Sequence, residues 1–161
     1  MDLVSEATLG NDVRRGLGRV LVAEDDREVR DALAEMLDAN GYEVVGRAET
    51  GRRAIELTTS TEPDVVLLDY RMPSGDGITV TQAIRKETPA TQVIMLTAFD
   101  EASLSLEART CGAFAFLAKG CPQQRLLATL EEAVKSKQRT EAEGSEQTVD
   151  LWDFDREAQE G

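Results

Sequence analysis

Asp64-Val-Val-Leu-Leu-Asp69-Tyr-Arg-Met-Pro73 is the most informative segment of the chain, because its continuous apolar run stops at a carboxylate. A short run of this kind suits a strand that is buried on both faces, as in a parallel sheet. Runs of the same character recur at Val20 to Ala23, Val93 to Leu96 and Phe114 to Leu117. A weaker strand is expected at Glu43 to Ala48. The pattern therefore predicts five strands.

Segments with helical periodicity follow the predicted strands. The first comes after Asp26, which is a suitable N-cap, and places Val29, Leu33, Met36 and Leu37 on one face. We expect the next three at about 52–59, 77–87 and 101–111, and the last after Pro122. Five strand–helix units in succession predict an α/β fold with a doubly wound, five-stranded parallel sheet and helices on both faces.

The two ends of the chain lack this alternation. Residues 1–18 contain three glycines among charged residues, so we expect a flexible N-terminal lead. Residues 19–136 would form the single folded domain, for which a hydrophobic content of 41% suffices. Residues 137–161 hold eight acidic residues against three basic ones, without core-forming periodicity, so we expect a disordered acidic tail. Its segment Leu151-Trp-Asp-Phe154 could dock on a basic groove or on the chain's own folded domain, although a solvated tail is the simpler interpretation.

Composition excludes several classes of function. No segment is long and apolar enough for a signal peptide or a membrane span, so we expect a cytoplasmic protein without membrane association. The net charge of −13, with no visible lysine or arginine cluster, disfavours direct nucleic acid binding. The absence of histidine removes Ser/His/Asp and Cys/His mechanisms. Cys111 and Cys121 have no metal-binding spacing and are interpreted as free thiols.

Residues able to handle a phosphate or a cation follow four of the strands: Glu24 and Asp25, Asp69, Thr97, and Lys119. The tips of parallel strands converge on one cleft. Three neighbouring carboxylates repel each other and favour a hard cation such as Mg²⁺, with Asp25 and Asp69 as direct ligands and Glu24 acting through water. Asp69 is the natural nucleophile toward a phosphoryl group, whose oxygens Lys119 and Thr97 would stabilise. Independent helix caps explain this joint pattern poorly.

Four motifs carry a resemblance to a known family: Val20-Leu-Val-Ala-Glu24-Asp25-Asp26, Asp64 to Pro73, Met95-Leu-Thr97-Ala and Phe116-Leu-Ala-Lys119. They resemble those of the response regulator receiver domain, the CheY-like family, over about residues 19–136. The resemblance implies a flavodoxin-like strand order 2-1-3-4-5.

The resemblance also implies a role for each matching residue. It makes Glu24 and Asp25 the acidic pair, Asp69 the phosphoacceptor, Thr97 the switch hydroxyl and Lys119 the family's lysine. It further implies that the main-chain carbonyl of Arg71 is a metal ligand, and that Phe116 changes rotamer when Asp69 is phosphorylated.

The implied function is that of a two-component signalling receiver, which catalyses only its own phosphoryl transfer and dephosphorylation and is no enzyme toward other molecules. A sensor histidine kinase would supply the phosphoryl group. A downstream protein would read the face made by the fourth helix, fifth strand and fifth helix, and a homodimer through this face is left open. Arg71 and Phe99 flank the route of attacking water in this family, and their size predicts slow self-dephosphorylation.

The chain departs from the family pattern in two ways. Gly120 follows Lys119 where many members have a proline in a cis peptide, so the resemblance does not fix the last loop. The sequence looks most like NarL/LuxR-type receivers, which normally precede a DNA-binding domain, whereas residues 137–161 are too few to encode one, so we expect a stand-alone receiver.

Two other receiver interpretations stay open: a non-phosphorylated scaffold, and the receiver fragment of a transcription regulator. Two enzyme or cofactor-binding classes fit the residues less well. A haloacid dehalogenase-type phosphatase would need an acid at the position of Arg71. A flavodoxin would need a Ser/Thr/Gly-rich loop in place of Glu24 to Asp26.

Overall fold

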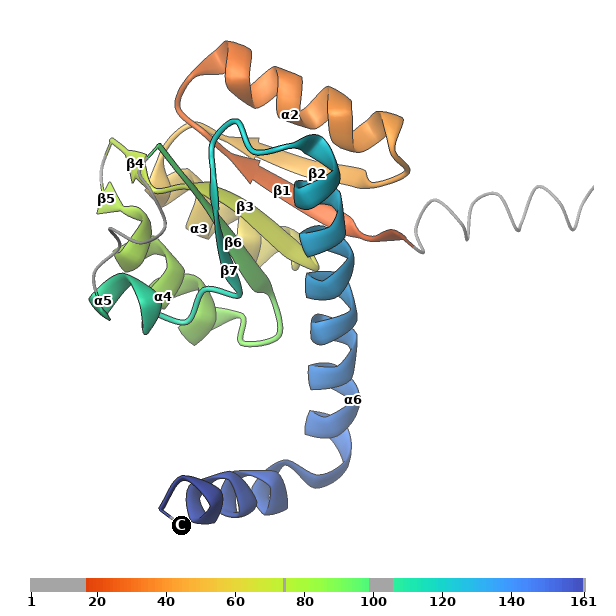
Figure 1. Ribbon diagram of the computed structural model, residues 1–161, viewed down its shortest axis with the longest axis vertical. Coiled ribbons are helices and arrows are strands. Elements are labelled where there is room, and N and C mark those ends of the chain that lie inside the picture. The colour runs from red at the N-terminus through yellow and green to blue at the C-terminus, as the bar shows by residue number, and fades with distance from the viewer. Residues whose placement is uncertain (1–16, 74, 99–105, 161) are drawn as a thin grey trace, which may run out of the picture.

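The computed structural model describes residues 17–73, 75–98 and 106–160. Five strands form one parallel sheet in the order β2-β1-β3-β6-β7 (Figure 1). Their bounds are β1 Arg19–Ala23, β2 Glu43–Ala48, β3 Val65–Asp69, β6 Gln92–Thr97 and β7 Ala115–Ala118. Counted along the chain, the five main strands have the order 2-1-3-4-5, so the predicted fold is confirmed.

Helices cover both faces of this sheet (Figure 1). On one face lie α2 (Arg27–Ala39) and α6 (Gln123–Glu160), and on the other lie α3 (Gly51–Thr61), α4 (Gly77–Glu87) and α5 (Leu106–Arg109). No helix within the described ranges is both long and apolar enough to cross a bilayer.

The strands alternate between two separate hydrophobic clusters. In β1, Val20 and Val22 pack into the cluster beneath α2 and α6, whereas Leu21 and Ala23 pack into the cluster beneath α3, α4 and α5. All four side chains are buried. Each fully buried valine or leucine contributes about 1.5–3 kcal/mol. A strand with two buried faces therefore has room for polar side chains only at its ends.

The predicted helices largely agree with the structure. The Asp26 carboxylate caps α2 by accepting a hydrogen bond of 3.1 Å from Val29 N, and α4 has the predicted bounds. In the fourth predicted helix, residues 106–109 are helical, whereas 101–105 lie outside the described residues. A short antiparallel hairpin of β4 (Arg71–Met72) and β5 (Gly75–Asp76) was not predicted.

Helix α6 extends to Glu160, although the sequence analysis expected a disordered tail from residue 137. The segment is rich in glutamate, alanine and glutamine, which favour helix without any apolar periodicity. An ion pair of 2.7 Å between Lys137 and Glu141 adds an i,i+4 contact. The predicted lead falls mostly on residues 1–16, outside the described ranges. The domain limits at residues 19 and 136 stay a prediction.

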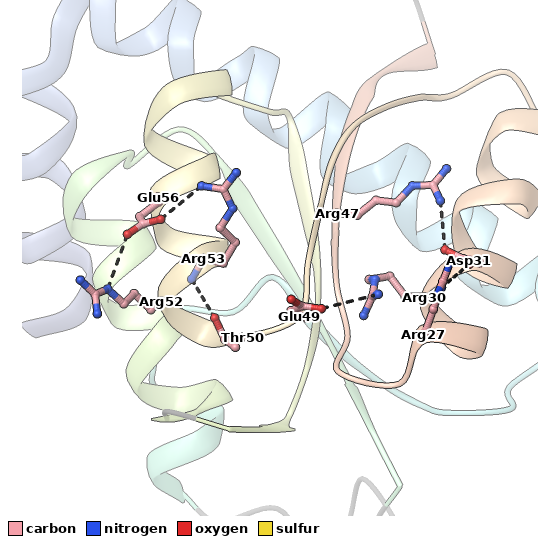
Figure 2. A pocket seen from close by; sticks show the side chains of 9 residues that line it. All are labelled: Arg27, Arg30, Asp31, Arg47, Glu49, Thr50, Arg52, Arg53 and Glu56. Atoms are coloured by element: carbon pink, nitrogen blue, oxygen red, sulfur yellow. Dashed lines mark hydrogen bonds and ion pairs between the residues drawn. The ribbon is translucent and has the colours of Figure 1, made fainter.

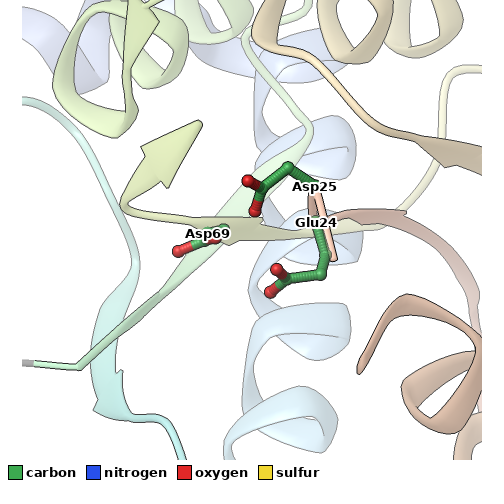
Figure 3. A group of neighbouring side chains, drawn as sticks. All are labelled: Glu24, Asp25 and Asp69. Atoms are coloured by element: carbon green, nitrogen blue, oxygen red, sulfur yellow. The ribbon is translucent and has the colours of Figure 1, made fainter. Parts of the chain in front are cut away.

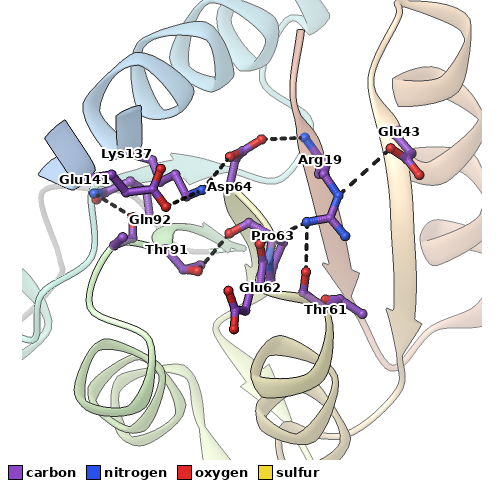
Figure 4. Close-up of polar contacts among 11 residues, drawn as sticks. Arg19, Glu43, Thr61, Glu62, Pro63, Asp64, Thr91, Gln92, Lys137 and Glu141 are labelled. Atoms are coloured by element: carbon purple, nitrogen blue, oxygen red, sulfur yellow. Dashed lines mark hydrogen bonds and ion pairs between the residues drawn. The ribbon is translucent and has the colours of Figure 1, made fainter. Parts of the chain in front are cut away.

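A polar network at the amino end of the sheet attaches α6 to β1 (Figure 4). The carboxylate of Asp64 accepts a hydrogen bond of 2.8 Å from Arg19 N and lies 3.2 Å from Lys137 Nζ. The Arg19 guanidinium donates to the carbonyls of Thr61 and Glu62 at the end of α3. Burial lowers the pKa of Lys137, but hydrogen bonds and attraction from Glu141 and Asp64 outweigh it, so the net shift is upward.

We predict that Lys137→Met destabilises the fold by about 1–3 kcal/mol, because it leaves the half-buried Asp64 carboxylate without its cation. Lys135→Met is the matched control, since Lys135 forms an exposed pair with Glu131, worth at most about 0.5 kcal/mol. Urea denaturation of both variants measures the difference. Equal midpoints for the two variants would contradict a structural role of Lys137.

Candidate functional site

Three carboxylates meet at the carboxyl end of the sheet (Figure 3). Glu24 and Asp25 directly follow β1, and Asp69 is the last residue of β3. The register pairs Ala23 with Leu68, so the residues that follow these two lie side by side. One oxygen from each carboxylate lies within 4.8 Å of the others. Glu24 and Asp69 are buried, whereas Asp25 is exposed.

Lys119 connects this acidic cluster to the last strand. Its Nζ lies 3.0 Å from Glu24 Oε1 and 3.1 Å from Asp69 Oδ2. Its main-chain N–H donates a hydrogen bond of 2.7 Å to Thr97 O, which fixes the residue just after β7. Three ionised carboxylates and one ammonium leave two negative charges in the site.

Backbone groups orient the two buried carboxylates. Asp26 N donates to Glu24 Oε2 at 3.0 Å, and Arg71 N donates to Asp69 Oδ1 at 3.2 Å. The loop after Asp69 is held by a hydrogen bond of 2.7 Å from Gly77 N to Tyr70 O. A Cβ atom on Gly77 would lie 3.0 Å from Tyr70 Cα, so this close approach requires glycine.

The buried charges shift two pKa values in the same direction. Burial raises the pKa of Glu24, and the negative charge of Asp69 adds to this, while Asp26 N–H and Lys119 offset part of it. Burial lowers the pKa of Lys119, but its hydrogen bonds to Glu24 and Asp69 outweigh that effect and the net shift is upward. The lysine therefore stays protonated and partly compensates the carboxylates.

The residues present fit a hard divalent cation. All donors are carboxylate oxygens, the ligand type that Mg²⁺ prefers. Glu24 Oε1 is buried, and the Lys119 ammonium contacts it at 3.0 Å. A bound cation of charge +2 would match the two negative charges that Lys119 leaves uncompensated. The cluster is thus an acidic triad of the kind that holds Mg²⁺.

Thr97 and Phe116 lie on the two strands beyond Asp69. Thr97 ends β6 and is fully buried; because Asp69 pairs with Leu96, it is one residue past the partner of Asp69. Phe116 pairs with Met95, is half-buried, and packs against the cluster under α3, α4 and α5. The structure therefore places Thr97 at the same sheet edge as the carboxylates, with Phe116 further back along β7.

The loop after β7 differs from the common family pattern. Gly120 has a φ of +88°, and the described residues contain no cis peptide bond. Proline fixes φ near −65°, so it cannot adopt this conformation. Arg71 is exposed in β4, and the role of its carbonyl stays a prediction. Phe99 lies outside the described residues.

An apolar groove of about 580 Å³ adjoins the acidic cluster. It lies between α2 and the loop after β7, and its lining includes Leu33, Met36 and Lys119. Val29, which the helical periodicity placed on the same face as Leu37, is 38% exposed in this groove. Part of the predicted apolar face of α2 therefore remains uncovered.

The sequence reasoning missed the β4–β5 hairpin beside the site. Its strands pair Arg71 with Asp76. The Asp76 carboxylate caps α4 by accepting a hydrogen bond of 2.8 Å from Thr79 N. The turn residues Pro73 and Gly75, with the Asp76-Gly77 dipeptide, were the available signals.

Residues 20–131 match the family model described as response regulator receiver domain. The transcriptional regulatory protein PdtaR of Mycobacterium tuberculosis is 40% identical over 132 residues, which cover 81% of this chain and 64% of PdtaR. The regulatory protein NarL of the same organism is 35% identical over 120 residues, 74% of this chain and 56% of NarL. The chain therefore spans less than two thirds of these relatives.

Solved receiver structures superpose well. The signal receiver domain of the response regulator NarL from M. tuberculosis gives a TM-score of 0.68 at 36% identity, covering 73% of this chain and 96% of that one. A response regulator receiver domain protein from Clostridium thermocellum gives a TM-score of 0.71 at 28% identity, covering 77% of this chain and 99% of that one.

We predict opposite effects of Asp25→Asn with and without Mg²⁺. In chelator the variant is at least as stable as the wild type, because one repelling charge is gone. At a Mg²⁺ concentration about 100 times the Kd of the wild type, the free energy of unfolding of the wild type rises by roughly 2.7 kcal/mol. The variant shows little of this increase. Asp38→Asn, an exposed position on α2, is the control and keeps it. If urea denaturation shows that Mg²⁺ stabilises all three proteins equally, the acidic cluster is not the Mg²⁺ site.

Proposed function

The chain belongs to the response regulator receiver domain family, and on that basis we propose that it accepts a phosphoryl group on Asp69 from a sensor histidine kinase. The observation that carries the proposal is the setting of Asp69. Its buried carboxylate has one oxygen 3.1 Å from Lys119 Nζ and the other held by Arg71 N, beside Glu24 and Asp25. A nucleophilic carboxylate needs neighbouring positive charge more than it needs a base.

In the proposed reaction, a carboxylate oxygen of Asp69 attacks phosphorus while the phosphorus–nitrogen bond of the kinase's phosphohistidine breaks, and the imidazole takes up the leaving electron pair. The Lys119 ammonium, now shared between Glu24 and Asp69, turns to the phosphoryl oxygens. Mg²⁺, held by Asp25 and Asp69 directly and by Glu24 through water, with the Arg71 carbonyl as a further ligand, would supply the remaining positive charge.

The added charge of roughly −1.5 to −2 on Asp69 would draw the Thr97 hydroxyl inward. Phe116, already half-buried against the cluster on its face of the sheet, would turn into the space vacated. This changes the surface formed by α5, β7 and the start of α6, which we propose as the face that a downstream protein or a second copy of the chain reads.

The kinase is proposed to dock in the groove beside Lys119. The groove presents the apolar side chains Val29, Leu33 and Met36 next to the reacting carboxylate. A helix that carries the donor histidine could lay an apolar face in it and bring its phosphoryl group to Asp69. Continuity of groove and site through Lys119 supports this occupant.

Phosphorylation of Asp69 can be tested without the kinase. Incubation with acetyl phosphate and Mg²⁺ adds one phosphoryl group to the wild type, which intact-mass measurement detects. Asp69→Ala removes the acceptor, and a chelator removes the cation, so both abolish the addition. If the wild type gains no mass under any condition, the chain is a non-phosphorylated receiver-like scaffold, the competing hypothesis.

The second prediction concerns the kinase. Val29→Asp places a charge in the apolar groove and slows phosphoryl transfer from a phosphorylated histidine kinase domain by about tenfold or more. Labelling by acetyl phosphate is the internal control and stays at the wild-type rate, because the small donor does not use the groove. A variant slowed equally with both donors would place the defect in the acidic site instead.

A further inference from the structure

A second hollow, of about 770 Å³, lies on the carboxyl side of β1 and β2 and is lined by arginines (Figure 2). The start of α2 contributes Arg27 and Arg30, the end of β2 contributes Arg47, and the start of α3 contributes Arg52 and Arg53. No basic cluster is visible in the sequence because Arg27 and Arg30 lie far along the chain from the other three arginines. The fold alone brings them together.

The hollow has more positive than negative charge. Its five arginines face only three carboxylates, and two of these carboxylates are each shared between two arginines. Asp31 lies 3.0 Å from Arg47 and 3.8 Å from Arg27. Glu56 lies within 3.5 Å of both Arg52 and Arg53. An excess of two positive charges is therefore concentrated here, on a chain whose net charge is −13.

Two of the arginines occupy positions that are unfavourable for the helix itself. Arg52 and Arg53 lie in the first turn of α3, which contains no acidic residue. The helix dipole is positive at this end, so it repels both guanidinium groups, which a neutral residue would avoid. An anion in the hollow would interact favourably with both the guanidinium groups and this helix end.

We propose that this hollow binds a small phosphorylated molecule with two or three linked phosphoryl groups. Its volume falls in the range of small-molecule sites, about 300–1,000 Å³. A guanidinium group can bind a phosphate through two parallel hydrogen bonds. The lining contains no aromatic or large aliphatic side chain, so the phosphoryl groups themselves, with little help from an attached base or chain, supply the binding.

Arg30 links the hollow to the acidic site. It donates a hydrogen bond of 2.8 Å to Glu24 O and its other nitrogen lies 3.8 Å from Glu49 Oε1, with only 12% of the side chain exposed. A ligand in the hollow would therefore contact a residue that positions the backbone at Glu24. The binding proposal itself does not depend on phosphorylation of Asp69.

The test is isothermal titration of the full chain with inorganic triphosphate, without Mg²⁺. The Arg52→Gln/Arg53→Gln variant weakens binding by about tenfold, since two of the five cations are lost. Arg125→Gln/Arg139→Gln is the matched control, because it removes the same charge from exposed positions on α6, and it binds as the wild type does. Circular dichroism checks that both variants are folded.

Glu56→Gln separates binding from damage to the fold. It frees Arg52 and Arg53 from their shared carboxylate and tightens triphosphate binding by roughly threefold, which a structural defect would not do. Asp69→Asn, which lacks the proposed phosphoacceptor, binds like the wild type, so the two proposals fail separately.

Several outcomes would overturn the proposal. One is that the wild type gives no heat of binding with triphosphate. Another is that the Arg52→Gln/Arg53→Gln variant and the control variant lose the same affinity. A third is that the chain binds ATP but not triphosphate. A single-stranded oligonucleotide that binds more tightly than triphosphate, and depends on Arg52 and Arg53, would replace the small ligand with a nucleic acid. Equal affinity for ATP and triphosphate supports recognition of the phosphoryl groups alone.

Discussion

The ion pairs of Lys119 with Glu24 and Asp69 are the interaction on which the acidic site depends. They join the end of β7 to the ends of β1 and β3, which are not its neighbours in the sheet. Without the ammonium, two buried carboxylates would repel each other across a few ångströms, an arrangement that opposes folding. Because Lys119 N also donates to Thr97 O, the end of β6 is tied to the same residue. The Lys119 ammonium therefore joins three strand ends, and the main chain of the same residue binds a fourth.

The sequence predicted the strands and the grouping of the acidic residues because both follow from burial, whereas the strand order was implied by the family resemblance. A strand buried on two faces, such as β3, accepts polar side chains only where it ends, so the sequence alone predicts the position of Asp69. The helical continuation of α6 could not be read in the same way. Its residues favour helix through backbone propensity, and the attachment of Lys137 to Asp64 is a long-range contact. The two-residue strands of the β4–β5 hairpin carry too little pattern to be recognised.

The groove and the arginine hollow escaped prediction for a different reason. Helical periodicity shows which face of α2 is apolar, but it does not show which residues of that face other elements cover, so the exposure of Val29 was not predicted. Arg27 and Arg53 are separated by helix α2 and strand β2, and the parallel direction of β1 and β2 brings the starts of α2 and α3 to one edge. Surface features of this kind belong to the tertiary arrangement and have no local signature.

The charge of the molecule is unevenly divided along the carboxyl edge of its sheet. All helices that follow strands begin at this edge, so main-chain N–H groups and positive helix ends collect there. At the start of α2 the carboxylates of Glu24, Asp25 and Asp26 compensate this positive potential. At the start of α3, Arg52 and Arg53 add to it. Arg30 stands between the two regions, bound to Glu24 O on one side and to Glu49 on the other. One edge of the sheet thus carries an acidic cluster and an arginine-lined hollow, and the Arg30 guanidinium contacts the backbone at the first while it lines the second.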